Sequence, residues 1–151
     1  MEKPLSIIIP VYNEGENIGR TLESIKKKIN TPHHIYLVYD FEEDNTLPAA
    51  LAYQKEGVTL RFLKNRGKGV VNAIITGLRY ARGEYLLVSM ADLSDDYGIV
   101  DEMCFLMTNG FDLVCGSRYM KGGKQIGGPL IKKTISRFAG ISLKYMAKMP
   151  V

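Results

Sequence analysis

The chain has 151 residues, which is the length of one globular domain. Its 46% hydrophobic and 24% charged residues exclude collagen-like, low-complexity and wholly disordered chains. The net charge of +4 is unevenly distributed, because residues 1–112 carry 12 basic and 16 acidic side chains, whereas residues 113–151 carry 8 basic and no acidic ones. This basic end could attract phosphate groups, an anionic membrane surface or nucleic acid, and a solvated helix face explains it equally well.

Short apolar runs alternate along the chain with stretches of helical spacing. Strands that alternate with helices are typical of βαβ units. The sequence therefore predicts an α/β fold with three αβα layers, in which helices cover both faces of a mainly parallel sheet. The predicted strands are residues 5–10, 35–38, 58–63, 85–90 and 111–115, and the predicted helices are residues 18–29, 46–56, 70–81, 95–109 and 130–148.

The two cysteines, Cys104 and Cys115, are too few for a disulfide framework and have apolar neighbours in the sequence. This favours reduced, buried thiols in a cytoplasmic protein. No apolar run reaches the roughly 18 to 20 residues of a membrane span. The first ten residues resemble neither a signal peptide nor an anchor.

The residues that follow the predicted strands are the candidates for a ligand site, because parallel sheets bind ligands at the carboxyl ends of their strands. Carboxylates gather in residues 11–14, 39–44 and 91–96, and Arg118 lies in residues 116–119. We expect these segments to meet at one edge. Carboxylates brought together repel one another unless something positive lies between them, and a divalent metal with a phosphorylated ligand is the usual solution. Helix capping is the alternative for residues 92–96.

Two common phosphate-binding motifs, GxGxxG and GxxxxGK[ST], are absent from the sequence. The turn Gly67-Lys68-Gly69 is either a phosphate-facing turn or a plain loop that leads into a helix.

Several motifs in fixed order carry a resemblance that spans essentially the whole chain. They are SIIIPVYNEGENI at residues 6–18, GLRYARGEYLLV at 77–88, ADL at 91–93, and CGSRYMKGGK at 115–124 followed by PLIKKTISR at 129–137. The sequence resembles the family 2 glycosyltransferases of the Rossmann-like GT-A fold, which bind nucleotide-diphosphate sugars. Within this family it is similar to polyprenyl-phosphate sugar transferases of the dolichol-phosphate mannosyltransferase type.

The resemblance implies a site for the nucleotide of the sugar donor. Pro10, Tyr12 and Glu14 match the family's P-x-Y-N-E turn, which contacts the nucleotide. Val38 and Asp40 match a strand end whose backbone and carboxylate hold the base and ribose.

The resemblance also implies a metal and phosphate site. Ala91 and Asp92 match the end of the D-A-D motif, where Asp92 would bind Mg²⁺ or Mn²⁺ and the donor diphosphate. Ser94 stands where close relatives have a glutamine that reaches the metal. Arg118 matches the arginine of G-S-R-Y, and Lys132 lies near a second basic position that faces phosphate.

The chain departs from the family pattern at three positions. Tyr39 replaces the first of two aspartates, Met90 replaces the first acid of the D-A-D motif, and Ser94 replaces the glutamine. Losing a carboxylate weakens a site for a hard cation, although the donor diphosphate brings oxygen ligands of its own. Asp95 or Asp96 would compensate, or would serve only the first turn of the next helix. A degenerate, non-catalytic nucleotide-sugar-binding domain is therefore the competing interpretation.

A polyprenyl phosphate needs no general base, because its second ionisation lies near pKa 6 and its oxygen is already an anion near neutral pH. The expected function is an inverting transfer of sugar from a GDP- or UDP-linked donor to this phosphate. The enzyme would be cytoplasmic and peripheral to the membrane, and its basic end would meet the acceptor. A transferase acting on a sugar hydroxyl is an alternative, and a nucleic-acid-binding module is disfavoured because no aromatic stacking surface accompanies the basic residues.

The organisation expected from the sequence is a single GT-A catalytic domain over residues 1–151. A D-x-T-S-G-F-like motif that shapes the acceptor side in the family is missing from the chain. We therefore expect the domain to be truncated on its acceptor side.

Overall fold

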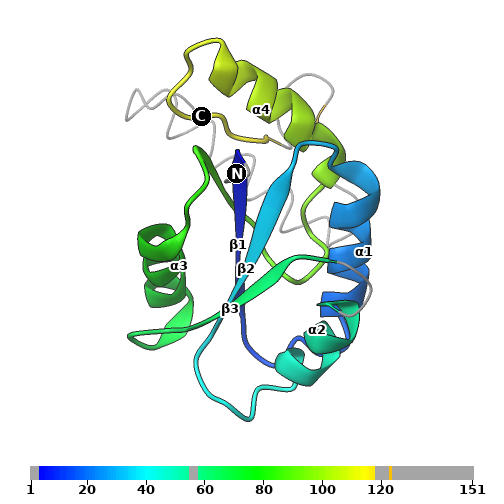
Figure 1. The fold of residues 1–151 in the computed structure, drawn as a ribbon, viewed down its shortest axis with the longest axis vertical. Helices are drawn as coiled ribbons and strands as arrows, with labels where there is room; N and C mark the ends of the chain where they lie inside the picture. Colours follow the sequence, from blue (N-terminus) through cyan, green and yellow to red (C-terminus); the bar gives the residue numbers. More distant parts are fainter. Residues whose placement is uncertain (1–3, 55–57, 118–122, 124–151) are drawn as a thin grey trace, which may run out of the picture. The chain divides into compact units, whose positions relative to one another are not determined.

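The computed structural model describes residues 4–54, 58–117 and 123 (Figure 1). The chain divides into two compact units, Met1–Val114 and Cys115–Val151. Most of the second unit, including the helix predicted at residues 130–148, lies outside the described residues. The single-domain organisation therefore stays a prediction.

A parallel sheet of four strands forms the centre of the first unit. The strands lie in the order β3-β2-β1-β4, and every neighbouring pair is parallel. This confirms the predicted α/β fold with a parallel sheet. The strands are β1 (Leu5–Val11), β2 (His33–Tyr39), β3 (Leu60–Lys64) and β4 (Tyr85–Val88).

Helices cover both faces of this sheet, as the sequence predicted. Helix α3 lies on one face, and α1 and α2 lie on the other (Figure 1). None of the helices in the described part of the chain is long and apolar enough to cross a membrane. The helices are α1 (Ile18–Lys28), α2 (Thr46–Gln54), α3 (Gly69–Tyr80), the short 3₁₀ helix η1 (Tyr97–Ile99) and α4 (Val100–Thr108).

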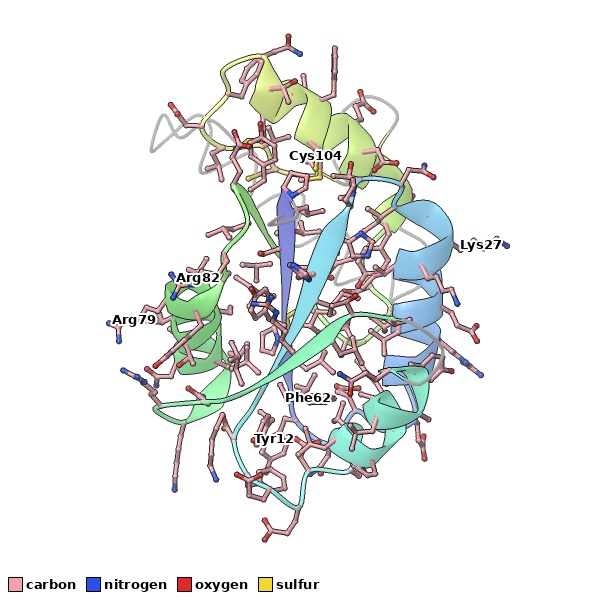
Figure 2. The ribbon with its side chains drawn as sticks, in the orientation of Figure 1. Tyr12, Lys27, Phe62, Arg79, Arg82 and Cys104 are labelled. Atoms are coloured by element: carbon pink, nitrogen blue, oxygen red, sulfur yellow. The ribbon has the colours of Figure 1, made fainter. Side chains whose placement is uncertain are left out.

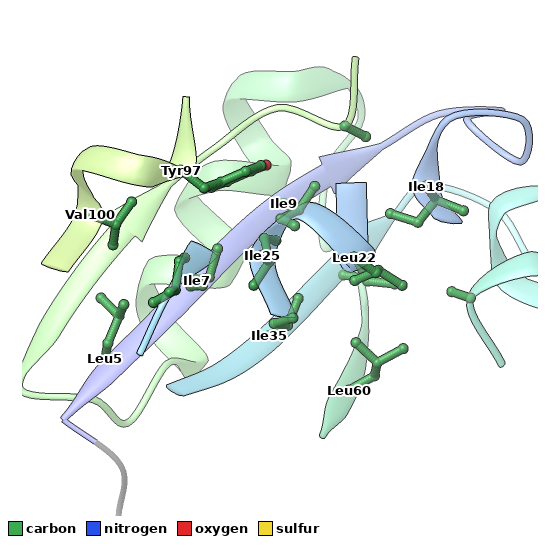
Figure 3. Packing of buried hydrophobic residues seen from close by; sticks show 14 of the residues in the cluster. Leu5, Ile7, Ile9, Ile18, Leu22, Ile25, Ile35, Leu60, Tyr97 and Val100 are labelled. Atoms are coloured by element: carbon green, nitrogen blue, oxygen red, sulfur yellow. The ribbon is translucent and has the colours of Figure 1, made fainter. Parts of the chain in front are cut away.

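Strand β1 is buried on both faces, which is why its sequence is a nearly continuous apolar run rather than an alternation. Ile7 and Ile9 belong to the larger core, together with residues of α1 such as Leu22 and Ile25 (Figure 3). Ile8 points to the other face, where it packs with Val38 and Ala73 beneath α3. The strand thus fixes both helical layers to the sheet.

The strand predicted at residues 111–115 is wrong. Residues 111–117 form neither helix nor strand, and Phe111 and Leu113 are 56% and 79% exposed. Cys115 is exposed as well, so the expectation of a buried thiol is wrong for Cys115, whereas Cys104 is buried. An apolar run becomes a strand only where a neighbouring strand pairs with it and other side chains cover it. In the described part of the chain, β4 is an edge strand and its pairing is with β1 alone.

Helix α4 is held to the amino end of the sheet, just before β2, by the carboxylate of Asp101. This carboxylate accepts hydrogen bonds from the main-chain N–H groups of Asn30 and Thr31, from the Asn30 amide and from the Thr31 hydroxyl, at 2.8–3.1 Å. Burial raises the pKa of Asp101, but the hydrogen bonds from Thr31 and Asn30 outweigh it and hold the pKa well below its usual range. The ionised side chain therefore stabilises the fold.

We expect Asp101→Ala to lower the free energy of unfolding by about 1–3 kcal/mol at neutral pH, because several donors lose a charged acceptor. Urea denaturation measures this loss. Since the folded pKa is depressed, the stabilisation is complete above the unfolded pKa of about 3.9 and disappears as the pH falls through the folded value. The variant and the wild type should therefore converge in stability in strong acid. A constant difference down to the lowest pH would contradict the role of the charge.

Candidate functional site

The site lies at the carboxyl edge of the sheet, where three segments begin. Val11 pairs with Tyr39 at the ends of β1 and β2, so the segments that follow these strands start side by side. After β4, the N–H of Ser89 donates to the carbonyl of Ile8 at 3.0 Å, so this segment continues along β1. The structure thus brings together the segments at residues 11–14, 39–44 and 89–96.

The turn after β1 is fixed by the start of α2. Asn13 has a positive φ of 56°, and its N–H donates to the carboxylate of Asp44 at 3.2 Å. The buried Asp44 also accepts the N–H of Thr46 at 2.8 Å, and the Thr46 hydroxyl accepts the N–H of Glu14 at 2.9 Å. The Glu14 carboxylate accepts the Asn17 amide at 2.8 Å. These contacts give Glu14 a structural role at the beginning of α1.

The predicted nucleotide residues at the strand ends differ in what they expose. Pro10 and Val38 are paired in register and their side chains are buried, so only their backbone can face a ligand. Tyr12 is 65% exposed and lies beyond the carboxyl end of β1 (Figure 2). Its ring packs edge to face against Phe41, with centroids 5.4 Å apart. This pair forms an aromatic surface, and Phe41 directly follows Asp40 in the sequence.

Asp40 is half-buried and its carboxylate has a fixed orientation. One oxygen accepts the side-chain amide of Asn65 at 2.6 Å, and the other accepts the N–H of Gly69 at 2.8 Å. An ionised carboxylate has about four lone-pair positions, so each oxygen can still accept a hydrogen bond from a ligand. The arrangement can therefore recognise N–H or O–H donors.

The segment after β4 combines a buried residue, Ala91, with the exposed carboxylate of Asp92. The carbonyl of the buried Ala91 accepts the Thr21 hydroxyl at 3.0 Å, which fixes the segment to α1. Asp92 is exposed, and its carboxylate accepts the N–H of Ser94 at 3.0 Å across Leu93, which has a positive φ of 61°. Hydrogen bonding from the side chain and backbone of Ser94 lowers the pKa of Asp92. Asp92 is therefore ionised at neutral pH, as a metal ligand must be.

The next two acids stabilise the protein's own backbone. Asp95 accepts the N–H of Met90 at 3.0 Å and the hydroxyl of Ser89 at 2.8 Å. Asp96 accepts the N–H of Gly98 at the start of η1, and forms an ion pair with Lys28 at 2.9 Å. These contacts place Asp96 in the helix-start role that the sequence left as one alternative, whereas Asp95 fixes the segment that precedes the helix.

One of the acids after β2 is also neutralised within the protein. Glu42 forms an ion pair with Lys64 at 2.7 Å and accepts the Tyr39 hydroxyl at 3.3 Å. Burial and the neighbouring Glu42 raise the pKa of Tyr39. The expected repulsion between the carboxylates is thus offset for several of them by lysines and N–H groups of the protein itself. Among the described residues, no three His, Cys, Asp or Glu side chains form a metal-binding group.

Met90 stands where a second metal-binding carboxylate was expected. Its side chain is 38% exposed, so it is not a core residue. Both of its main-chain polar groups are hydrogen-bonded, because its N–H donates to Asp95 and its carbonyl accepts the Tyr97 hydroxyl at 3.4 Å. Arg118 and Lys132, the predicted phosphate-binding residues, lie outside the described residues. Sequence reasoning missed Asn65, although its position directly after β3 is itself a strand end.

Comparison with known proteins identifies related sequences over most of the chain. Residues 6–148 match the family described as glycosyl transferase family 2. The chain is 32% identical over 136 residues to a dolichol-phosphate mannosyltransferase of Pyrococcus furiosus, covering 89% of this chain and 39% of that protein. It is 29% identical over 147 residues to an undecaprenyl-phosphate 4-deoxy-4-formamido-L-arabinose transferase of Yersinia enterocolitica, covering 94% and 43%. The chain thus spans less than half the length of these relatives.

Solved structures share the fold. A mannosyltransferase from Pyrobaculum calidifontis, in complex with GDP-Man and Mn²⁺, has a TM-score of 0.52 and 26% identity over 61% of this chain and 28% of its own. The S. aureus TarS fragment 1–349 has a TM-score of 0.58 and 21% identity over 80% of this chain and 40% of its own. This second likeness concerns the fold alone.

Proposed function

Because the chain belongs to glycosyl transferase family 2 and has its Rossmann-like GT-A fold, we propose that it binds a nucleotide-diphosphate sugar at the carboxyl edge of its sheet and transfers the sugar to a polyprenyl phosphate. The observation that carries the proposal is the pair of carboxylates, Asp40 and Asp92, at the ends of β2 and β4. Asp40 is oriented by two hydrogen bonds, and Asp92 is ionised and exposed. The names of the relatives support a polyprenyl-phosphate acceptor.

The donor would lie across the ends of β1, β2 and β4. Tyr12 and Phe41 offer an aromatic surface for the base, and Asp40 can accept hydrogen bonds from the base or ribose. The backbone of Pro10 and Val38 at the same edge, and Glu14 in the following turn, complete the proposed nucleotide-binding set.

Mg²⁺ or Mn²⁺ is the cofactor that we propose, because Asp92 is a hard anionic ligand and the structurally similar mannosyltransferase of Pyrobaculum calidifontis is in complex with Mn²⁺. Asp92, with Ser94 beside it and Ala91 anchoring the segment, would hold the ion together with the donor diphosphate. Bound there, the ion supplies positive charge that stabilises the departing nucleoside diphosphate. Among the described residues Asp92 is the one carboxylate proposed for the metal, so the site fits an ion that the diphosphate shares.

In the proposed transfer, a phosphate oxygen of the acceptor attacks the anomeric carbon of the donor sugar. A bond forms between this oxygen and the anomeric carbon while the bond to the diphosphate breaks, and the nucleoside diphosphate leaves with the electron pair. One such displacement inverts the anomeric centre. Arg118 and Lys132 are proposed to position the acceptor phosphate, since guanidinium and ammonium groups bind phosphate well. This acceptor implies a cytoplasmic location at the membrane surface, with no nucleic-acid partner.

Calorimetry with GDP and with UDP tests the donor site. We expect one of the two nucleotides to bind, with an affinity about 100-fold higher in Mn²⁺ than in EDTA, because a metal ion offsets the charge of the diphosphate. Equal affinity in Mn²⁺ and EDTA would remove the metal from the proposal. The absence of binding for both nucleotides in Mn²⁺ would overturn donor binding, whereas binding without sugar transfer would favour the degenerate, non-catalytic domain for which Met90 and Tyr39 are the motivation.

A further inference from the structure

We propose that Asn65 is a positioning residue for nucleotide recognition, which acts by holding the carboxylate of Asp40 in the orientation that the donor requires. The inference rests on the proposed function, because it takes Asp40 as a nucleotide-binding residue. Asn65 follows β3, whereas Asp40 follows β2, so the contact joins two strand ends at the site edge.

The side chain of Asn65 is only 7% exposed and is surrounded by fixed partners. Its amide nitrogen donates to Asp40 at 2.6 Å and to the carbonyl of Gly69 at 3.3 Å. Its amide oxygen accepts the N–H of Gly67 and the hydroxyl of Thr76, both at 3.1 Å. Because the N–H of Gly67 can only donate, the oxygen must face Gly67 and the nitrogen must face Asp40. The direction of the amide is therefore determined by its surroundings.

The same network joins Asp40 to the first residue of α3. Gly69 begins this helix with a positive φ of 81°, a conformation that favours glycine. Its N–H donates to one oxygen of Asp40, while its carbonyl accepts from Asn65. Asp40 thus has one hydrogen bond to each oxygen and keeps lone pairs on both for a ligand. A carboxylate fixed in this way loses little conformational freedom when a ligand binds.

A neutral amide suits this position better than a charged side chain. An aspartate at position 65 would place a second carboxylate against Asp40, at the position of the present 2.6 Å contact. Two carboxylates this close cannot both ionise, so they would share a proton and the pKa of one would rise. Asn65 avoids this repulsion and donates a hydrogen bond to the charge instead. Asparagine and aspartate at position 65 therefore predict different pH dependences of nucleotide binding, which an experiment can compare.

The first experiment is a double-mutant cycle on the full chain, with GDP and UDP in Mn²⁺ as probes and calorimetry as the measurement. We expect Asp40→Ala and Asn65→Ala each to weaken binding about tenfold, and the double variant to be no weaker than Asp40→Ala. The matched control is Asp101→Ala, which destabilises the fold from the opposite end of the sheet and should leave affinity unchanged. Additive losses in the double variant would overturn the positioning role.

The second experiment uses Asn65→Asp and the exchange variant that combines it with Asp40→Asn. Asn65→Asp should bind weakly at pH 8 and recover about tenfold toward pH 5, where the carboxylate pair holds a proton. Its stability should fall as the pH rises through the raised pKa. The exchange variant should regain stability, because the amide and carboxylate again pair, but not affinity, because position 40 lacks its charge. An affinity of Asn65→Asp that follows the wild-type pH profile would contradict the proposal.

The outcomes distinguish the proposed role of Asp40 in donor binding from the positioning role of Asn65. If Asp40→Ala leaves the affinity for both nucleotides unchanged, the proposed role of Asp40 in donor binding fails. If Asp40→Ala weakens binding and Asn65→Ala does not, only the positioning role of Asn65 fails.

Discussion

A Gly77→Val variant is expected to lose about 3 kcal/mol or more of folding stability, because overpacking a close contact in the core forces backbone and side chains apart. Gly77 is a buried residue of α3 that lies directly against β1. A Cβ atom at this position would lie 2.3 Å from a methyl carbon of Ile8. Ile8 is fully buried in the central strand, so it has no free space to move into. Guanidinium denaturation at neutral pH measures the loss.

A compensating substitution provides the control for this prediction. Combining Gly77→Ala with Ile8→Ala removes the Cγ2 and Cγ1 carbons of Ile8, which would lie 2.3 and 3.3 Å from the new Cβ, and alanine also favours the helix by about 1 kcal/mol over glycine. The double variant should therefore be more stable than either single variant. Equal stability of Gly77→Val and the wild type would show that α3 does not depend on close approach to β1.

The order of the elements could be predicted because it depends on local patterns. The apolar run of β1 and the helical spacing of α1 are properties of single segments, and the structure places both within a few residues of the prediction. The helix predicted from residue 95 begins later, because Asp95 turns back to Ser89 and Met90 instead of entering a helix. The prediction of a strand at residues 111–115 is wrong for a different reason, since a strand depends on neighbours that its own sequence does not specify.

The candidate site was predictable in position but not in its electrostatics. Strand-end reasoning located Asp40 and Asp92, because parallel strands bring their carboxyl ends to one edge. It left open whether the acids bind a metal or cap a helix, since a sequence does not show which N–H groups face them. The contacts of Asp95 with the N–H of Met90, and of Asp40 with the N–H of Gly69, come from the folded backbone. Asn65 was missed for the same reason, as its role depends on a residue 25 positions away.

Replacing Asp92 by asparagine should have the largest effect on ligand binding. We expect Asp92→Asn to lower the affinity for the bound nucleoside diphosphate in Mn²⁺ by about 100-fold, which corresponds to roughly 2.8 kcal/mol. Asp92 is the exposed carboxylate of the segment after β4, and its lowered pKa keeps it charged at neutral pH. An amide oxygen is a weaker ligand for a hard cation than a carboxylate. In EDTA the variant and the wild type should bind equally, and calorimetry in both conditions measures the difference.

Two substitutions in the same segment decide whether this effect is local to Asp92. Asp96→Asn removes the same charge four residues away, but Asp96 is paired with Lys28 and Gly98, so the Mn²⁺ dependence should not change. Met90→Asp adds a carboxylate at an exposed position, where it remains solvated, and should tighten Mn²⁺ binding as a second anionic ligand. If Asp92→Asn keeps its Mn²⁺ dependence while Asp96→Asn loses it, the metal binds at Asp96 and the proposed site is wrong. If Met90→Asp weakens Mn²⁺ binding, position 90 does not face the ion.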